Sequence, residues 1–202
     1  LDACDQWRSL RRLAAAGIAV PATRLVRRPD ELVAALEEVP GPPWFVKGRR
    51  GSQGSQVRLA ADRAEAARWA GLFWGTGASL LVQEDLRGHG PVERHLVVGD
   101  VVVASAVALP ARGEFRTNAH RGGRFVAIAP GARGRSAELA VRATRAVGLP
   151  FAAIDVIGGD APRVLDVNAS PGLEALEAAT RRDLATPIVA ALVAAAASRG
   201  VR

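Results

Sequence analysis

Two short apolar segments near the C-terminus constrain this chain most, because each carries oxygen groups of the kind that bind a metal ion. Residues 151–157 contain Asp155, while residues 163–167 contain Asp166 and lead directly into Asn168. A Gly-Gly-Asp turn separates the segments, which predicts an antiparallel pair of strands. Residues two apart on a strand face the same side, so Asp166 and Asn168 can point at one ion. Such oxygens suit Mg²⁺ bound to a nucleotide phosphate, although aspartates that cap turns at strand ends would show the same spacing.

A single lysine is the second constraint on function. The chain has 27 Lys plus Arg residues, and Lys47 is its only lysine, at the end of the apolar run 44–46. A small, flexible loop follows it and contains Gly51, Ser52, Gln53 and Gly54. This is not a Walker A loop, in which the lysine comes after the glycines. The order predicts a lysine that reaches phosphates while the loop covers them; a surface lysine before an ordinary hairpin turn is the alternative.

Two further groups of polar residues have the chemistry of a nucleotide site. Gln83 and Glu84 end an apolar strand and could read an adenine edge and a ribose, or the strand could simply run into solvent. Arg116 and Asn118 lie in the basic loop 113–123. A guanidinium suits the charge that spreads over a transferring phosphoryl group. Asn118 could assist the metal or the phosphates.

Periodicity and turn residues predict an α+β chain with mainly antiparallel strands, a small first lobe and a larger second one. The expected domains are residues 1–83, with a phosphate-covering loop at 49–56, and residues 84–202, with the metal site. Gly99-Asp100 predicts a two-residue hairpin turn. Helices are expected at 5–16, 29–36, 62–70, 135–147 and 183–198, strands at 44–47, 56–59, 79–83, 93–98, 101–107, 151–157 and 163–167, and a loop at 115–125.

Composition narrows the classes of protein. Hydrophobic residues make up 49% and charged residues 23%, which is the balance of a globular chain. The net charge of +7 fits a polyanionic partner, but the arginines are scattered and aromatics are only 4%, so nucleic-acid binding is not favoured. Cys4 is alone, which excludes a disulfide framework.

Membrane and targeting patterns are weak. The apolar run 188–197 is too short to span a bilayer, so a cytoplasmic protein without membrane contact is the expectation. The absence of methionine predicts a processed, trimmed or partial product.

Seven blocks of sequence, taken in order, resemble the ATP-grasp superfamily and within it the RimK-type amino-acid ligases. The Asn-Ala-Ser-Pro-Gly form of the last block is typical of that branch, and the resemblance runs from about Asp5 to the final helix. The blocks are residues 45–47, 51–54, 81–84, 94–99, 115–118 with Gly122-Gly123, 154–155 and 166–172.

The resemblance implies the ATP-grasp fold, with two α+β lobes and a nucleotide cleft between them. It assigns the phosphates to Lys47 and the loop 51–54, and the adenosine to Gln83, Glu84 and Asp85. Arg94 and Arg116 are also counted with the nucleotide site. Arg116 and Asn118 would reach the phosphate or the reacting carboxylate. Mg²⁺, or Mn²⁺ in its place, would be held by Asp155, Asp166 and Asn168.

The resemblance also implies a reaction. ATP would phosphorylate a carboxylate to an acylphosphate, and an amine would attack to form an amide with release of ADP and phosphate. The amino donor would be glutamate or another amino acid, and the acceptor a protein tail, a peptide or a metabolite. A homo-oligomer is also expected, because similar ligases form tetramers.

The chain departs from the family pattern at several places. The resemblance starts at about Asp5, so we expect the usual N-terminal domain to be missing, and the expected Asp-Lys opening reads Asp5-Gln6. A glycine expected after the loop is Gln56. A carboxylate expected before the Ile-Arg pair falls at Val92, and a basic pair falls near Ala108-Leu109. These departures keep a second hypothesis open, a non-catalytic ATP-binding module that has lost its substrate domain.

Overall fold

The computed structural model describes residues 5–49, 56–117, 122–132 and 134–199, and these form two compact units. The small unit holds Asp5–Trp7 and Pro21–Gly88, and the larger one holds Arg8–Val20 and the described residues from His89 onward. The units differ from the predicted division at 83/84 in two ways. The boundary lies five residues later, and most of the first helix groups with the larger unit.

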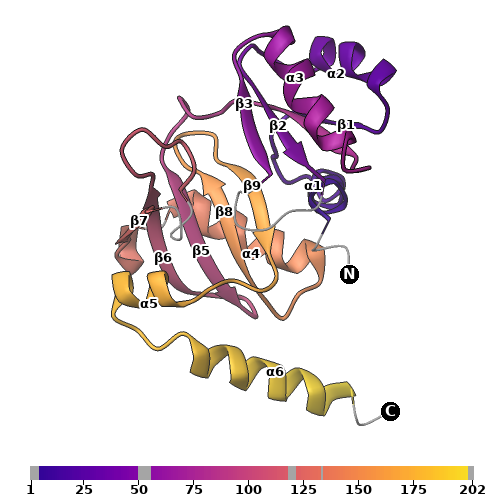
Figure 1. Cartoon of the computed structure of the whole chain (residues 1–202). Coiled ribbons are helices and arrows are strands. Elements are labelled where there is room, and N and C mark those ends of the chain that lie inside the picture. The colour runs from indigo at the N-terminus through magenta and orange to yellow at the C-terminus, as the bar shows by residue number, and fades with distance from the viewer. Residues whose placement is uncertain (1–4, 50–55, 118–121, 133, 200–202) are drawn as a thin grey trace. The chain divides into compact units, whose positions relative to one another are not determined.

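The small unit is a four-stranded antiparallel sheet with helices on one face (Figure 1). The strand order is β1-β4-β2-β3. Its strands are β1 (Thr23–Val26), β2 (Trp44–Gly48), β3 (Val57–Ala60) and β4 (Leu80–Glu84), and its helices are the 3₁₀ turn η2 (Pro29–Glu31), α2 (Leu32–Glu38) and α3 (Arg63–Trp74).

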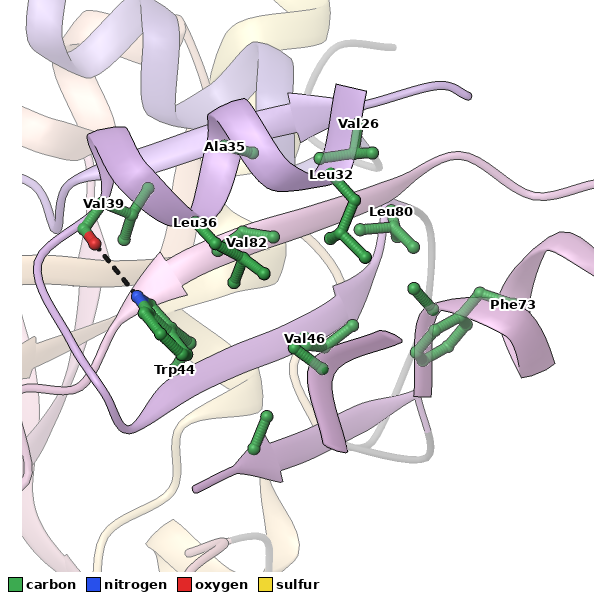
Figure 2. Packing of buried hydrophobic residues seen from close by; sticks show 13 residues of the cluster. Val26, Leu32, Ala35, Leu36, Val39, Trp44, Val46, Phe73, Leu80 and Val82 are labelled. Carbon is green, nitrogen blue, oxygen red and sulfur yellow. Dashed lines mark hydrogen bonds between the residues drawn. The ribbon is translucent and has the colours of Figure 1, made fainter. Parts of the chain in front are cut away.

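Alternate residues of these strands build the core of the small unit. Trp44 and Val46 point to the helices α2 and α3 and pack there with Leu36 and Phe73, as Figure 2 shows. The Trp44 indole nitrogen donates a hydrogen bond of 2.9 Å to the carbonyl of Val39, so its one polar atom is satisfied in the core (Figure 2). Because side chains alternate along a strand, the intervening residues Phe45 and Lys47 lie on the opposite face of the sheet.

The larger unit contains a five-stranded antiparallel sheet in the order β7-β6-β5-β8-β9. The predicted hairpin is present, with Gly99 at φ +58° in the turn between β5 and β6. The strands are β5 (Val92–Val98), β6 (Val101–Leu109), β7 (Arg124–Ala127), β8 (Phe151–Ile157) and β9 (Arg163–Asn168), and the helices are α1 (Gln6–Ala15), the 3₁₀ turn η4 (Pro130–Ala132), α4 (Gly134–Val147), α5 (Glu174–Thr180) and α6 (Ala185–Arg199).

Helices cover both faces of this second sheet. On one face α4 packs over Val97, Ile154 and Val167, joined by Leu13 of α1. On the other face Leu176 of α5 and Ile188 of α6 pack over Leu96, Ala104 and Ala153, which leaves the polar residues of β5, β8 and β9 further along that face. The first helix thus belongs to the larger core because its apolar side packs against α4 and the sheet.

The expected elements are largely confirmed, but several ends differ; for example, the helix expected at 62–70 runs to Trp74. The predicted loop at 115–125 was wrong at its end, where β7 pairs with β6 as a short and mostly exposed edge strand. The helix α5 was not predicted, because seven residues give too little periodicity. The helix predicted at 29–36 begins as a 3₁₀ turn and runs to Glu38, whereas Asp62 caps α3 as expected by accepting a hydrogen bond from the Glu65 amide.

None of the helices in the described ranges has the length and apolar character needed to cross a membrane.

Candidate functional site

Lys47 belongs to a chain of polar side chains on the face of the small sheet opposite α2 and α3. Its ammonium donates to Oε1 of Gln83 on the neighbouring strand β4. Gln83 is only 1% exposed, and its amide nitrogen donates to Oγ1 of Thr23 at 2.9 Å, which in turn donates to the carbonyl of Pro21 at 2.9 Å. A neutral amide, itself fixed by a second strand, therefore orients the lysine. The structure thus brings Lys47 and Gln83 into contact, and their roles at the phosphates and the adenosine stay predictions.

The two acidic residues at the end of β4 have partners nearby in the small unit. Oε1 of Glu84 accepts from the Ala22 amide at 2.7 Å. Asp85 accepts from Nε of Arg87 at 2.9 Å and from Nη2 at 2.7 Å. These contacts hold the chain where it leaves β4. The predicted loop residues Gly51, Ser52, Gln53 and Gly54 lie outside the described residues.

The predicted metal ligands occupy one face of the larger sheet. Asp155 on β8 lies directly opposite Asp166 on β9, and Asn168 lies opposite Ala153, two residues along the same strand. A register shift follows Asp155 in β8. Oδ1 of Asn168 accepts from the Ser170 amide at 3.0 Å, which fixes the amide side chain at the strand end. Asp166 and Asn168 thus lie on the same face of the sheet, as expected from alternation along a strand, and Asp155 lies on that face too.

Arg94 lies on the other side of Asp155. It is the cross-strand partner of Asp155 on β5, and its Nε and Nη2 atoms each donate to one carboxylate oxygen at 2.7 Å. The two side chains are 15% and 16% exposed. The charge of the Asp155 carboxylate, with a smaller contribution from Asp166, raises the pKa of Arg94 above its ordinary range, so Arg94 is a permanent cation.

Arg116 is held by a carboxylate two residues before it. Glu114 accepts from Nε of Arg116 at 2.9 Å and from Nη2 at 2.6 Å, and also from the amides of Phe115 and Arg116. The Arg116 side chain is the main cause that lowers the pKa of Glu114 to about 2. The loop therefore presents Arg116 already paired. Asn118 lies outside the described residues.

Two positions that depart from the family pattern prove to be neighbours. Val92 and Ala108 are cross-strand partners at the end of the β5–β6 hairpin, on the same face as Arg94. An expected carboxylate and an expected basic residue are thus replaced together by a small apolar pair.

The donor set fits a hard divalent cation in its chemistry. Among the described residues, no group of three or more His, Cys, Asp and Glu side chains could hold a metal. The predicted set has two carboxylates and one amide, and Asp155 and Asp166 are directly opposite each other. Oxygen donors of this kind, with further positions left to water and phosphate, suit Mg²⁺. Both oxygens of Asp155 already accept hydrogen bonds from Arg94.

Sequence reasoning did not predict the side-chain partners of the candidate site residues. The pairing of Glu114 with Arg116 was readable in principle, since the two charges are two residues apart. The contacts of Arg94 with Asp155, and of Gln83 with Thr23, join residues about sixty positions apart. No local pattern reports such contacts.

Comparison with known proteins identifies the fold. A family model described as the RimK-like ATP-grasp domain matches residues 3–192. The chain belongs to the RimK-like ATP-grasp family. A curated relative from Pseudoalteromonas translucida (strain TAC 125), named probable alpha-L-glutamate ligase, is 38% identical over 200 residues, which are 97% of this chain and 65% of that protein. The chain thus spans about two thirds of the length of this relative.

Solved structures agree on the ATP-grasp fold. The ATP-grasp ligase PsnB, complexed with a minimal precursor, is 25% identical with a TM-score of 0.69, covering 95% of this chain and 59% of that one. PsnB has also been solved with precursor, Mg and ADP, at 24% identity and a TM-score of 0.67, covering 93% and 57% of the two chains. D-alanine–D-alanine ligase from Bacillus anthracis, complexed with ATP, has a TM-score of 0.74 at 17% identity, covering 98% and 68%. The fold of this family member is therefore the ATP-grasp fold, with two α+β units built on antiparallel sheets.

Proposed function

We propose that this RimK-like ATP-grasp protein is an ATP-dependent carboxylate–amine ligase that uses Mg²⁺, with Mn²⁺ as a substitute. One observation carries the proposal: Asp155 and Asp166 face each other across β8 and β9 with Asn168 on the same face. Arg94 already compensates one of the two carboxylate charges, so the argument for a metal is the donor set itself: two carboxylates and an amide on one face suit a divalent cation. Family membership supports a nucleotide-bound metal as that cation.

The proposed roles follow the chemistry of the side chains. Lys47, oriented by Gln83, would contact the ATP phosphates, with the loop 51–54, and Glu84 and Asp85 would lie near the adenosine. Asp155, Asp166 and Asn168 would hold Mg²⁺, which neutralises phosphate oxygens when bound. Arg116 and Asn118 would stabilise the transferring phosphoryl group. The contribution of the protein is positioning and charge stabilisation.

The proposed reaction has two steps. A carboxylate oxygen of the acceptor attacks the γ-phosphorus of ATP, which forms an acylphosphate and releases ADP. The amine of the second substrate then attacks the acyl carbon, which forms an amide and releases phosphate. Glu114 occupies Nε and Nη2 of Arg116, so a phosphoryl group would meet the remaining guanidinium donors or compete with Glu114 for the fork.

The substrates and setting of the reaction are also proposals. The name of the Pseudoalteromonas relative supports glutamate as the amino acid added. The precursor bound to PsnB supports a peptide as acceptor, with a protein tail or a metabolite as alternatives. ATP as the substrate supports a cytoplasmic location. The exposed apolar residues Val189, Leu192 and Val193 of α6 support a homo-oligomer, which light scattering would test.

Calorimetric titration of ATP into the chain, with and without Mg²⁺, is the first test. We expect binding in the micromolar-to-millimolar range that requires Mg²⁺. Release of ADP and phosphate is then followed with glutamate and carboxylate acceptors. Turnover supports the ligase, and binding without turnover on any acceptor supports the non-catalytic module. No binding at millimolar ATP would overturn both.

A further inference from the structure

The metal-binding face of the larger sheet contains a row of charges across three strands. Arg94 on β5 lies opposite Asp155 on β8, and Asp155 lies opposite Asp166 on β9. The guanidinium contacts both oxygens of Asp155, through Nε and Nη2 at 2.7 Å each. This is the two-bond fork geometry in which arginine binds a carboxylate most tightly. The cation is therefore placed on the carboxylate that the proposed function gives to Mg²⁺.

Neighbouring residues on the same sheet hold the guanidinium in place. The Arg94 guanidinium lies over the ring of Phe125 on β7, with its carbon 5.3 Å from the ring centre. Its cross-strand partner on β6 is the small residue Ala106. Arg94 and Asp155 are both largely buried, so water screens their attraction less than at an exposed pair. The Arg94–Asp155 ion pair is thus held in place by its neighbours in the sheet, unlike an ion pair at the exposed surface.

The charges of the side chains and of the metal determine how the Arg94–Asp155 contact affects metal binding. Asp155 and Asp166 carry two negative charges, and Arg94 compensates one of them. A divalent cation bound to Asp155 must take at least one oxygen to which Arg94 now donates, and it places two positive charges beside a third. Binding of metal alone is therefore opposed. A nucleotide triphosphate brings negative charge with the metal and offers another anion to the guanidinium.

We propose that Arg94 is the resident counter-ion of the metal-binding carboxylates and that metal loading displaces it from Asp155. The inference rests on the proposed function, since it takes Asp155 and Asp166 as the ligands. It makes metal and nucleotide binding mutually dependent: the chain without nucleotide binds metal weakly, and the coupling between the two ligands passes through Arg94. A change at Arg94 that strengthens binding of metal alone, but not of metal with nucleotide, weakens this coupling.

The inference is tested by titrating Mn²⁺ into the full chain without nucleotide. The electron paramagnetic resonance signal of the free Mn²⁺ ion measures how much of it is bound. The variants are Arg94→Gln, which removes the charge, and Arg94→Lys, which keeps the charge but not the fork. Arg145→Gln is the matched control, because Arg145 also pairs with an aspartate in this unit, Asp100, away from the face. We expect Arg94→Gln to bind Mn²⁺ about tenfold more tightly than the natural chain. Arg94→Lys should fall between them, and Arg145→Gln should match the natural chain.

The outcomes separate this inference from the proposed function. Equal or weaker Mn²⁺ binding by Arg94→Gln, or no binding at all, overturns the inference. Asp155→Asn serves as the reference: if it leaves Mn²⁺ binding unchanged, the metal site itself is misplaced and the proposed function loses its ligands. If Asp155→Asn abolishes binding while Arg94→Gln changes nothing, only the counter-ion role fails. Thermal melts followed by circular dichroism check that each variant folds. If Arg94→Gln does not fold, Arg94→Lys decides: tighter Mn²⁺ binding than in the natural chain supports the inference, and equal or weaker binding overturns it.

Discussion

The two sheets place their functional side chains by different means. In the small unit, Lys47 receives its orientation from the neutral amide of Gln83, which is fixed by Thr23. In the larger unit, Asp155 is fixed by the full charge of Arg94 through two hydrogen bonds. A neutral partner directs a charge without cancelling it. A charged partner directs and compensates it, so that a ligand of the same sign must compete.

The two sheets are also packed differently. The small sheet has helices α2 and α3 on one face, and its polar chain lies wholly on the other. The larger sheet has apolar contacts on both faces, and Arg94, Asp155 and Asp166 share a face with Leu96 and Ala153. Carboxylates next to an apolar layer need a compensating charge. The polar chain of the small unit is buried as well, with Gln83 1% exposed, so burial calls for a partner in both units and does not decide whether that partner is charged.

Removal of the directed lysine should have the largest effect. Lys47→Ala deletes the proposed phosphate contact, and we expect ATP turnover to fall about 10²–10³-fold or more, because charge stabilisation of the phosphoryl group is lost. Asp166→Ala, which removes a proposed metal ligand from the other unit, should abolish turnover similarly. A coupled assay of ADP release measures both. Lys47→Arg is the control that keeps the charge, and full activity of Lys47→Ala would refute the site.

Removal of the charged partner should have the largest effect on stability. Arg94→Ala leaves Asp155 buried beside Asp166, and we expect it to lower the free energy of unfolding by about 3 kcal/mol. Urea denaturation measures this change. The control is Arg145→Ala at the exposed pair with Asp100, expected to cost under about 1 kcal/mol. Equal costs for the two variants would mean that burial of the Arg94 pair adds nothing.

Exchange of the neutral partner for a charged one would make the small unit resemble the larger. Gln83→Glu places a carboxylate at Lys47, and we expect ATP affinity to fall about tenfold, because the carboxylate competes with phosphate for the ammonium. Calorimetry with Mg²⁺ present measures the affinity. Gln83→Met, of similar volume but without charge, should weaken binding less. Unchanged affinity in Gln83→Glu would show that Lys47 does not contact the phosphates.

The smallest expected effect concerns acid stability near Arg116. The Arg116 guanidinium lowers the pKa of Glu114 from its ordinary 4.5 to about 2. The folded state thus binds this proton less readily than the unfolded state, so the contribution of Glu114 to stability is complete above pH 4.5 and is lost as the pH falls towards 2. Glu114→Gln should flatten this part of the profile of urea midpoints against pH. Glu138→Gln, at an exposed position on α4, should leave the profile unchanged.

Much of the fold could be predicted because its signals are local. The hairpin at Gly99, the cap at Asp62 and the antiparallel pair around residues 158–160 are set by residues within a few positions of one another. The edge strand β7 has no such local signal. It is a strand because its backbone forms hydrogen bonds with β6, and its four residues are too few to show a pattern. The place of the first helix also depended on a partner far along the chain, α4.

The sequence alone determined which side chains share a face, since alternation along a strand is a property of the local backbone. It therefore placed Asp166 with Asn168 without knowledge of the sheets. Only the tertiary structure decided which strands are neighbours, and hence that Arg94 meets Asp155 and that Gln83 meets both Lys47 and Thr23. The physical reason is that strand order depends on backbone hydrogen bonds and apolar burial summed over a whole unit. The strand order therefore also decides that Arg94 lies beside Asp155 on the face with the proposed metal ligands.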